Sequence, residues 1–215
     1  GDSQILSSSP ERFLKLTGDV VEARPIKGTR PRGATPTEDA ALAENLMTSE
    51  KDRAENVMIV DLLRNDISKV CRDHSVVVPE LCSLESYARV HHLVSAVTGQ
   101  LRPETGAVDV LRACFPGGSI TGAPKVRAME IIAELEPNHR GPYCGALGFI
   151  GYDGAMDSNI AIRTMALKDG AAVFQAGGGI VADSDPADEY LETLAKAEAL
   201  FAAFAPQISA VVQAT

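Results

Sequence analysis

Residues 143–176, with the sequence YCGALGFIGYDGAMDSNIAIRTMALKDGAAVFQA, contain three largely apolar runs separated by short polar turns. The runs are residues 143–151, 158–167 and 171–176, and the turns contain Asp153-Gly154 and Lys168-Asp169-Gly170. Turns this short join antiparallel strands, because parallel strands need a much longer crossover connection. The stretch therefore predicts antiparallel sheet.

Further strands are expected upstream, where short apolar or β-branched runs end in turn residues. They are residues 5–10, 13–18, 74–79 and 87–98. Residues 24–36 lie between two of these strands and contain three prolines and two glycines, so we expect a loop there. Loops of this length inside a compact chain are often functional.

Helical periodicity separates the predicted strands. Residues 36–63 favour two helices, with a cap at Thr35 or Thr37 and a break near Thr48-Ser49. Further helices are expected at residues 107–114, from Pro124 in the first turn to Leu135, and from Asp185-Pro186 to residue 204. The order predicts a mixed α/β protein with antiparallel sheets, followed by a loose tail at residues 206–215.

Composition places the chain among ordinary globular proteins. Its 215 residues are 45% hydrophobic and 23% charged, which is enough to bury a core. The net charge of −9 argues against a nucleic-acid partner, and neither a membrane span nor a signal peptide is expected. The spacing of the four cysteines fits neither a disulfide scaffold nor a zinc site; they are Cys71, Cys82, Cys114 and Cys144. A reducing cytoplasm is therefore the simplest interpretation.

The last predicted helix has an apolar stripe and a charged face. Glu189, Glu192 and Lys196 lie together on the charged face, where carboxylates one turn apart can approach a common cation or can simply be solvated. The apolar stripe is expected to face the core at the 3.6-residue period: Tyr190, Leu194, Ala197, Phe201 and Phe204.

Glu55 is an acid on an otherwise apolar helix stripe, which it shares with Ile59 and Leu62, and Asp52 lies one turn before it. A buried carboxylate without a partner costs about 3–5 kcal/mol, so a counterion is expected. A hard divalent ion such as magnesium is one candidate. The alternative is a structural ion pair with a basic residue of the same helix: Lys51, Arg53 or Arg64.

Two glycine-rich turns, residues 117–122 and 176–179, offer free backbone N–H groups to an anion, or serve only as turns. Arg163 lies between Ala161 and Met165 in a predicted strand. An arginine there can clamp a carboxylate with two hydrogen bonds, or lie on the surface of an edge strand.

Several separate segments together resemble the chorismate-binding enzymes, which include the anthranilate, aminodeoxychorismate, isochorismate and salicylate synthases. The matching segments are SPE at 9–11, RPIKGTR at 24–30, KDRAEN at 51–56, DLLRND at 61–66, GSITGAPK at 118–125, AGGGI at 176–180 and EYLET at 189–193. The resemblance implies an α/β sandwich of two antiparallel sheets flanked by helices, of which residues 1–205 form the C-terminal part. The missing N-terminal half would then cover exposed sheet edges.

The resemblance also implies a magnesium cofactor. Glu55 and Glu192 are the implied ligands, with Glu189 and Asp52 nearby, and the ion would hold the ring carboxylate of chorismate. Such an ion would supply the counterion that Glu55 needs.

By the same resemblance, Arg163 and Tyr143 hold the enolpyruvyl carboxylate, and Lys196 supports the substrate carboxylates. The backbone N–H groups of Gly177, Gly178 and Gly179 also support the substrate carboxylates.

Four further residues complete the implied site. Thr29 and Thr121 would contact the ligand, and Glu11 would protonate the leaving hydroxyl or shuttle a proton. His92 would lie near the departing hydroxyl, although outside the motifs it is as well explained as a core or surface histidine.

Lys27 distinguishes branches of the family. Anthranilate synthases carry alanine at this place, whereas aminodeoxychorismate synthases carry the lysine present here, which attacks the ring to form a covalent adduct. A nucleophilic amine must be neutral, and the free pKa of lysine is about 10.4. We expect the crowd of Arg24, Arg30 and Arg32, with magnesium, to lower it. Outside the motif, Lys27 would be a flexible loop lysine.

The resemblance therefore implies chorismate amination that leads to 4-aminobenzoate and folate or to an antibiotic. Ammonia would come from a separate glutaminase subunit, since the chain offers no glutaminase triad. An anthranilate synthase that carries Lys27 and a non-catalytic chorismate-binding fragment remain as alternatives. Isochorismate and salicylate synthases are a weaker fit, because their motif lacks a lysine at this position.

Overall fold

The computed structural model describes residues 2–182 and 184–204. The chain divides into two compact units, which we describe separately. Unit 1 comprises Gly1–Pro10, Asn138–Ala146 and Ile160–Thr215, and unit 2 comprises Glu11–Pro137 and Leu147–Asn159. The tail expected at residues 206–215 lies outside the described residues. No helix in the described part of the chain is long and apolar enough to cross a membrane.

Unit 2 is built on a seven-stranded sheet in the order β4-β6-β3-β2-β8-β7, with β5 also paired to β6. The pairs β2–β3, β2–β8, β3–β6, β4–β6 and β5–β6 are antiparallel. The strands are β2 (Arg12–Thr17), β3 (Val20–Ala23), β4 (Ile26–Pro31), β5 (Val77–Ser86), β6 (Val90–Gln100), β7 (Ala146–Ile150) and β8 (Met156–Ile160).

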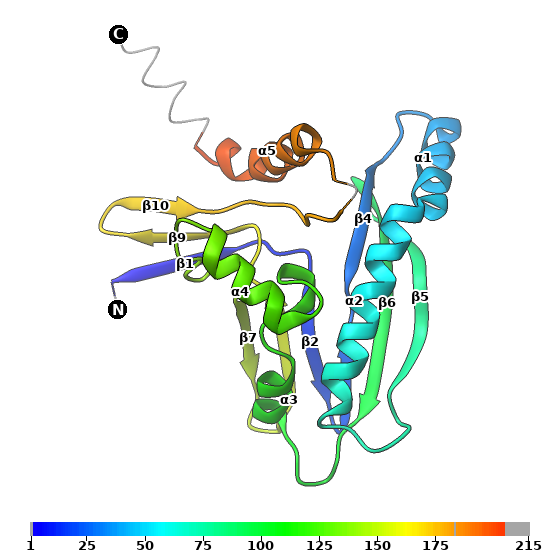
Figure 1. Ribbon diagram of the computed structural model, residues 1–215, viewed down its shortest axis with the longest axis vertical. Coiled ribbons are helices and arrows are strands. Elements are labelled where there is room, and N and C mark those ends of the chain that lie inside the picture. The colour runs from blue at the N-terminus through cyan, green and yellow to red at the C-terminus, as the bar shows by residue number, and fades with distance from the viewer. Residues whose placement is uncertain (1, 183, 205–215) are drawn as a thin grey trace. The chain divides into compact units, whose positions relative to one another are not determined.

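Four helices belong to unit 2: α1 (Pro36–Thr48), α2 (Glu50–Ser68), α3 (Ala107–Cys114) and α4 (Lys125–Leu135). The predicted break between α1 and α2 is confirmed at Ser49, which ends α1 and accepts from the Asp52 N–H as the cap of α2. Helix α2 runs beside β4 and β6 (Figure 1), where Asn56 donates to the Leu93 carbonyl at 3.2 Å. Polar and apolar contacts thus fix α2 against the sheet.

Unit 1 contains a smaller antiparallel sheet in the order β1-β9-β10 and the helix α5 (Pro186–Ala202). Its strands are β1 (Ser3–Ser7), β9 (Thr164–Lys168) and β10 (Ala171–Phe174). Asp185 caps α5 by accepting from the Ala187 and Asp188 N–H groups. Helix α5 lies beside β10 (Figure 1), with the Phe174 and Phe201 rings 5.1 Å apart.

The mixed α/β composition and the antiparallel sheets confirm the predicted fold class. The prediction of a loop over residues 24–36 was wrong, because β4 lies inside it and pairs with β6. The predicted strand at 74–79 begins at Val77 and continues to Ser86, and the four cysteines are free and buried.

The single strand predicted over residues 158–167 was also wrong. It is two strands, β8 and β9, which belong to different sheets. The break includes Arg163, whose φ of 49° is a left-handed conformation that non-glycine residues rarely adopt.

Most of the apolar stripe predicted for α5 is exposed. Tyr190, Leu194 and Phe201 are exposed, while Ala197 and the acid Glu189 are the buried positions. The buried side of α5 therefore combines one residue from each predicted face, Ala197 and Glu189, and Phe201 packs against Phe174 of β10 although much of its side chain is exposed.

Candidate active site

The Lys27 amine lies inside unit 2, between α2 and the glycine-rich turn at residues 117–122. Its Nζ is 3.9 Å from Glu55 Oε2 and 3.5 Å from the Ser119 carbonyl oxygen. The Lys27 and Glu55 side chains are each only 17% exposed. The ammonium partner of Glu55 thus comes from another element, whereas the candidates weighed from the sequence were all on its own helix.

A bulge at Gly28 directs Lys27 and Arg30 to the same side of β4. Residues three apart face opposite sides of a regular strand, but the register of β4 shifts between Ile26 and Thr29. Gly28 has a φ of 84°, and a Cβ there would lie 2.7 Å from Leu46 Cδ1. Glycine is therefore required for the bend that brings Lys27 to α2.

Arg30 uses this bend to reach Asp52. Its Nη2 is 3.1 Å from Asp52 Oδ2, and its Nε donates to Asn45 Oδ1 at 2.8 Å. Asp52, expected near the metal, is thus neutralised here by an arginine of the same motif as Lys27.

Thr29 faces the other side of the sheet, where its Oγ1 is 2.9 Å from His92 Nδ1 on the neighbouring β6. Burial lowers the pKa of His92 below its ordinary 6.5, although the Gly28 carbonyl and Glu85 act in the opposite direction. The imidazole is therefore mainly neutral at pH 7. Glu11, the expected proton donor, is buried, with 8% exposed.

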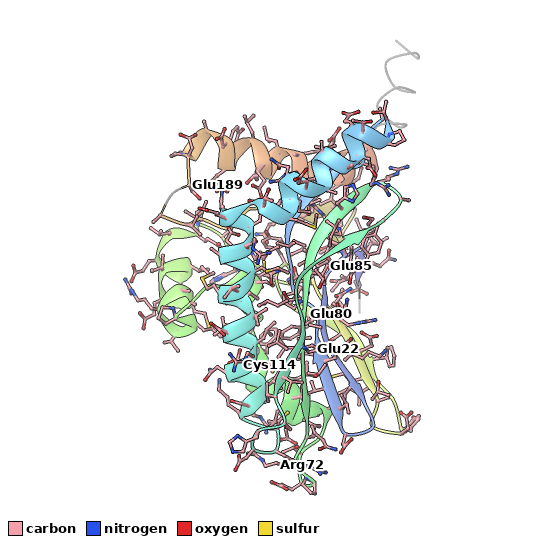
Figure 2. The ribbon with its side chains drawn as sticks, turned by 90° about the vertical axis from the view of Figure 1, so that its right-hand side faces the viewer. Glu22, Arg72, Glu80, Glu85, Cys114 and Glu189 are labelled. Carbon is pink, nitrogen blue, oxygen red and sulfur yellow. The ribbon has the colours of Figure 1, made fainter. Side chains whose placement is uncertain are left out.

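The three arginines expected to crowd Lys27 each have a carboxylate partner. Arg24 pairs with Glu80 and Glu85, Arg30 with Asp52, and Arg32 with Asp39. Glu80 and Glu85 both belong to β5 (Figure 2). Because these charges are compensated, the predicted like-charge repulsion on Lys27 loses its basis.

The glycine-rich turn at residues 117–122 packs on α2. A Cβ on the buried Gly118 would lie 2.4 Å from Leu62 Cδ2. Thr121, expected to contact the ligand, donates its hydroxyl to the Gly117 carbonyl at 2.8 Å. The turn is thus closed by its own side chain.

The second glycine-rich turn, in unit 1, is surrounded by polar groups. A Cβ on Gly178 would lie 2.9 Å from Glu189 Oε2, 3.7 Å from Glu192 Oε1 and 3.8 Å from Lys196 Nζ. A Cβ on Gly177 would lie 3.3 Å from the Tyr143 hydroxyl. The structure thus brings together most of the unit 1 residues predicted for the site.

Arg163 joins this group through the Lys196 carbonyl, to which its Nη1 donates. Burial lowers the pKa of Arg163, while Tyr143 raises it. The strained backbone of Arg163 and its partly buried guanidinium are typical of a functional position.

The expected metal ligands are divided between the units, with Glu55 and Asp52 in unit 2 and Glu189 and Glu192 in unit 1. Among residues 2–182 and 184–204, no group of three or more His, Cys, Asp or Glu side chains is arranged to hold a metal. The donor chemistry fits magnesium, because all four are carboxylates and the space beside Gly178 is left open to two of them.

Sequence reasoning did not find the link between the Ser119 carbonyl and Lys27, nor the contact of Lys125 with Asp66. Both contacts join segments distant in sequence. The only signal available was that GSITGAPK and DLLRND both match the same family.

Comparisons with known proteins agree on the family. A family model described as chorismate binding enzyme matches residues 1–202. Aminodeoxychorismate synthase component 1 of Klebsiella aerogenes is 56% identical over 91% of this chain and 43% of its own length. Anthranilate synthase component 1 of Streptomyces coelicolor is 51% identical over 94% of this chain and 40% of its own.

Among solved structures, the crystal structure of anthranilate synthase component I from Streptococcus pneumoniae TIGR4 is similar, with a TM-score of 0.83 and 45% identity. The match covers 92% of this chain and 43% of that chain. This similarity confirms the predicted fold class. The chain spans less than half the length of these relatives. Both aminodeoxychorismate synthases and anthranilate synthases are among them, so their names do not distinguish between these two activities.

Proposed function

Since the chain belongs to the chorismate-binding enzyme family, we propose that it carries the chemistry of an aminodeoxychorismate synthase, which replaces the C4 hydroxyl of chorismate with an amino group. The observation that supports this best is the position of Lys27. Its amine is largely enclosed and lies between Glu55 and the Ser119 carbonyl. A flexible surface lysine would not be held in this way.

In the proposed reaction, the neutral Lys27 amine attacks ring C2 while the C4 hydroxyl leaves. Glu11 donates the proton that lets the hydroxyl depart as water. Ammonia then attacks C4, the bond between Lys27 and C2 breaks to return the neutral amine, and the proton lost by the new C4 ammonium group restores Glu11. Two displacements thus place nitrogen para to the ring carboxylate and regenerate the lysine.

His92 fits a role beside the departing hydroxyl. Its lowered pKa keeps the imidazole neutral, so that it can donate a hydrogen bond from one nitrogen while the other faces Thr29. The hydrogen bond to Thr29 would fix the orientation of the ring.

The polar groups around Gly177 and Gly178 would hold the substrate carboxylates. Arg163 and Tyr143 would bind the enolpyruvyl carboxylate, and Lys196 with the Gly177, Gly178 and Gly179 backbone would support both acids. The guanidinium of Arg163 presently bonds the Lys196 carbonyl and would exchange it for a charged acceptor.

Magnesium would be held by Glu55 and Glu192, with Glu189 and Asp52 nearby. When bound, it would supply positive charge for the ring carboxylate of chorismate. Glu55 also pairs with Lys27, and Glu192 with Lys196.

The proposal extends to a partner and a location. The names of relatives as component 1 support a second component, which we propose to be a glutaminase that releases ammonia. We also propose that the enzyme works in the cytoplasm, in the supply of 4-aminobenzoate for folate or an antibiotic.

Intact mass spectrometry of the active enzyme with chorismate, magnesium and no ammonia tests the proposal. We expect a covalent adduct on Lys27, absent in Lys27→Ala, and an amination rate about a thousandfold lower in that variant. Lys168→Ala, at an exposed lysine of β9, serves as the control. Undiminished amination by Lys27→Ala, with no adduct on the wild type, would refute the proposal.

Anthranilate synthase is the second candidate, because relatives with that name are 50% and 51% identical to this chain. Product analysis separates the two. Anthranilate and pyruvate as products would favour this alternative, whereas 4-amino-4-deoxychorismate supports the leading proposal. Chorismate binding without turnover, even with ammonia supplied, would favour a non-catalytic binding role.

A further inference from the structure

A buried carboxylate near the C-terminal end of α2 forms ion pairs with two lysines. Asp66 is 2% exposed, and its oxygens lie 2.5 Å from Lys125 Nζ and 2.7 Å from Lys69 Nζ. Lys69 belongs to the end of the same helix and its side chain is 52% exposed. The Lys125 side chain, by contrast, is 15% exposed and comes from the first residue of α4. Lys125 is therefore the partner that ties a separate element to Asp66.

The same ammonium holds the end of a third helix. Lys125 Nζ donates to the Cys114 carbonyl at 2.9 Å, and Cys114 is the last residue of α3. Carbonyl groups at a helix end lack partners within the helix and attract cations. Residues 115–124 thus form a turn whose two ends meet at one lysine.

One stripe of α2 supports this turn from end to end. Glu55, Leu62 and Asp66 follow at spacings that place them on the same helix face. Leu62 packs where a Cβ of Gly118 would be, and Asp66 binds Lys125 beyond the end of the turn. The turn is therefore held on the face of α2 that also carries Glu55.

The part of the turn between these contacts reaches Lys27. The Ser119 carbonyl lies 3.5 Å from Lys27 Nζ, next to Gly118. Moving the turn away from α2 would remove this carbonyl and open the space around the amine.

We propose that Asp66 and Lys125 are positioning residues, which clamp residues 115–124 to α2 so that Ser119 meets the Lys27 amine. Neither residue is among those assigned to the site above. The clamp follows from the geometry alone, whereas its catalytic consequence rests on the proposed function.

Lys125→Met tests the clamp, because it keeps an unbranched apolar stem and removes the ammonium. Hydrogen exchange of the amides at 117–122 should quicken about tenfold or more, as expected when a local contact is lost. Acylation of Lys27 by a water-soluble reagent, followed by mass spectrometry, should quicken by roughly threefold or more as the amine gains access to solvent.

Matched variants separate positioning from general destabilisation. Lys69→Met removes the other cation from the same carboxylate and should change both rates less than about twofold, because Lys69 is half exposed and follows Asp66 on the same helix, so it ties no separate element to α2. Lys125→Arg keeps the charge and should restore most of the protection. If Lys125→Met does not fold, Asp66→Asn weakens both ion pairs with the shape of the side chain preserved, and its comparison with Lys69→Met isolates the contribution of Lys125.

In the active enzyme, Lys125→Met should lower kcat for amination by about tenfold, with a smaller change in the KM for chorismate. Equal exchange and acylation rates in Lys125→Met and Lys69→Met would overturn the clamp. An unchanged kcat with faster exchange would overturn its catalytic role. If the wild type forms no adduct, the proposed function fails, and the exchange and acylation rates still decide the clamp.

Discussion

The two glycine-rich turns look alike in the sequence but are surrounded by opposite chemistry. At residues 117–122, the space beside Gly118 is filled by the apolar end of Leu62, and Thr121 bonds back to Gly117. At residues 176–179, the space beside Gly178 is bordered by the charged ends of Glu189 and Lys196. The first turn is packed and closed, whereas the second is open to charged groups.

This difference shows what a glycine run does and does not predict. Glycine indicates that something approaches the backbone closely, but it does not identify what approaches. An apolar neighbour makes the glycine a packing residue, whose replacement costs stability. Polar side-chain ends make it a spacer in a site, whose replacement costs function.

Among the variants of the two turns, Gly178→Ala should have the largest effect, and this effect should be a loss of activity and not of stability. The added Cβ would meet only the ends of side chains, such as Glu189 Oε2 at 2.9 Å, which can move without disturbing the fold. We expect amination to fall by about a hundredfold, since a displacement of 1 Å in a site can cost that much. Steady-state kinetics and a thermal melt measure the two effects.

Gly106→Ala is the matched control. Gly106 has a φ of −139° and nothing within 4 Å of an added Cβ, so alanine fits there. A Gly178→Ala enzyme that melts several degrees lower but works at the control rate would reverse the assignment of that turn.

Local signals made much of the fold predictable. The start of α1 depends on Thr35 and the start of α2 on Ser49, whose hydroxyls accept from nearby backbone N–H groups. The start of α5 depends in the same way on Asp185. Each cap involves only neighbours in sequence, so each can be recognised without tertiary structure.

Tertiary contacts made the rest unpredictable. β4 has too many turn residues to resemble a strand, and only its pairing with β6 makes it one. The break at Arg163 arises where the chain passes from one sheet to another. On α5, Glu189 is buried beside the polar groups around Gly178, while Phe201 packs against Phe174, so burial there depends on neighbours that the helical period does not reveal.

The candidate site shows the same division. The residue types and motifs were visible in the sequence and came with their roles from the resemblance. The neighbours of Lys27 were not visible in the sequence. Lys27 meets Glu55 because of the bulge at Gly28, and it meets Ser119 because the turn at 115–124 is clamped at Lys125. Such contacts depend on register and packing, which the spacing of residues does not determine.

Gly118→Ala should affect stability more than activity. Its Cβ would lie 2.4 Å from Leu62 Cδ2 and 3.1 Å from Leu62 Cγ, so the turn or the leucine must shift. Overpacking of this kind costs about 1–3 kcal/mol of unfolding free energy. Chemical denaturation measures it.

Leu62→Ala in the same chain makes room and should recover part of that loss. The double variant should therefore be more stable than the sum of the single changes predicts. Additive losses would show that Leu62 does not fill the space beside Gly118, and the contrast between the two turns would weaken.

Thr121→Val should have the smallest effect, a slight loss of stability. It tests further whether the turn at 117–122 is closed, in contrast to the turn at 176–179. The change keeps the shape of the side chain and removes the hydrogen bond to the Gly117 carbonyl, which is worth about 0.5–1.5 kcal/mol. Thr121→Ser keeps the donor and should lose less. If the hydroxyl serves the ligand instead of the turn, Thr121→Val will leave the denaturation midpoint unchanged and raise the KM for chorismate. Comparing the midpoint with the KM therefore decides whether this turn closes on itself or opens toward a substrate.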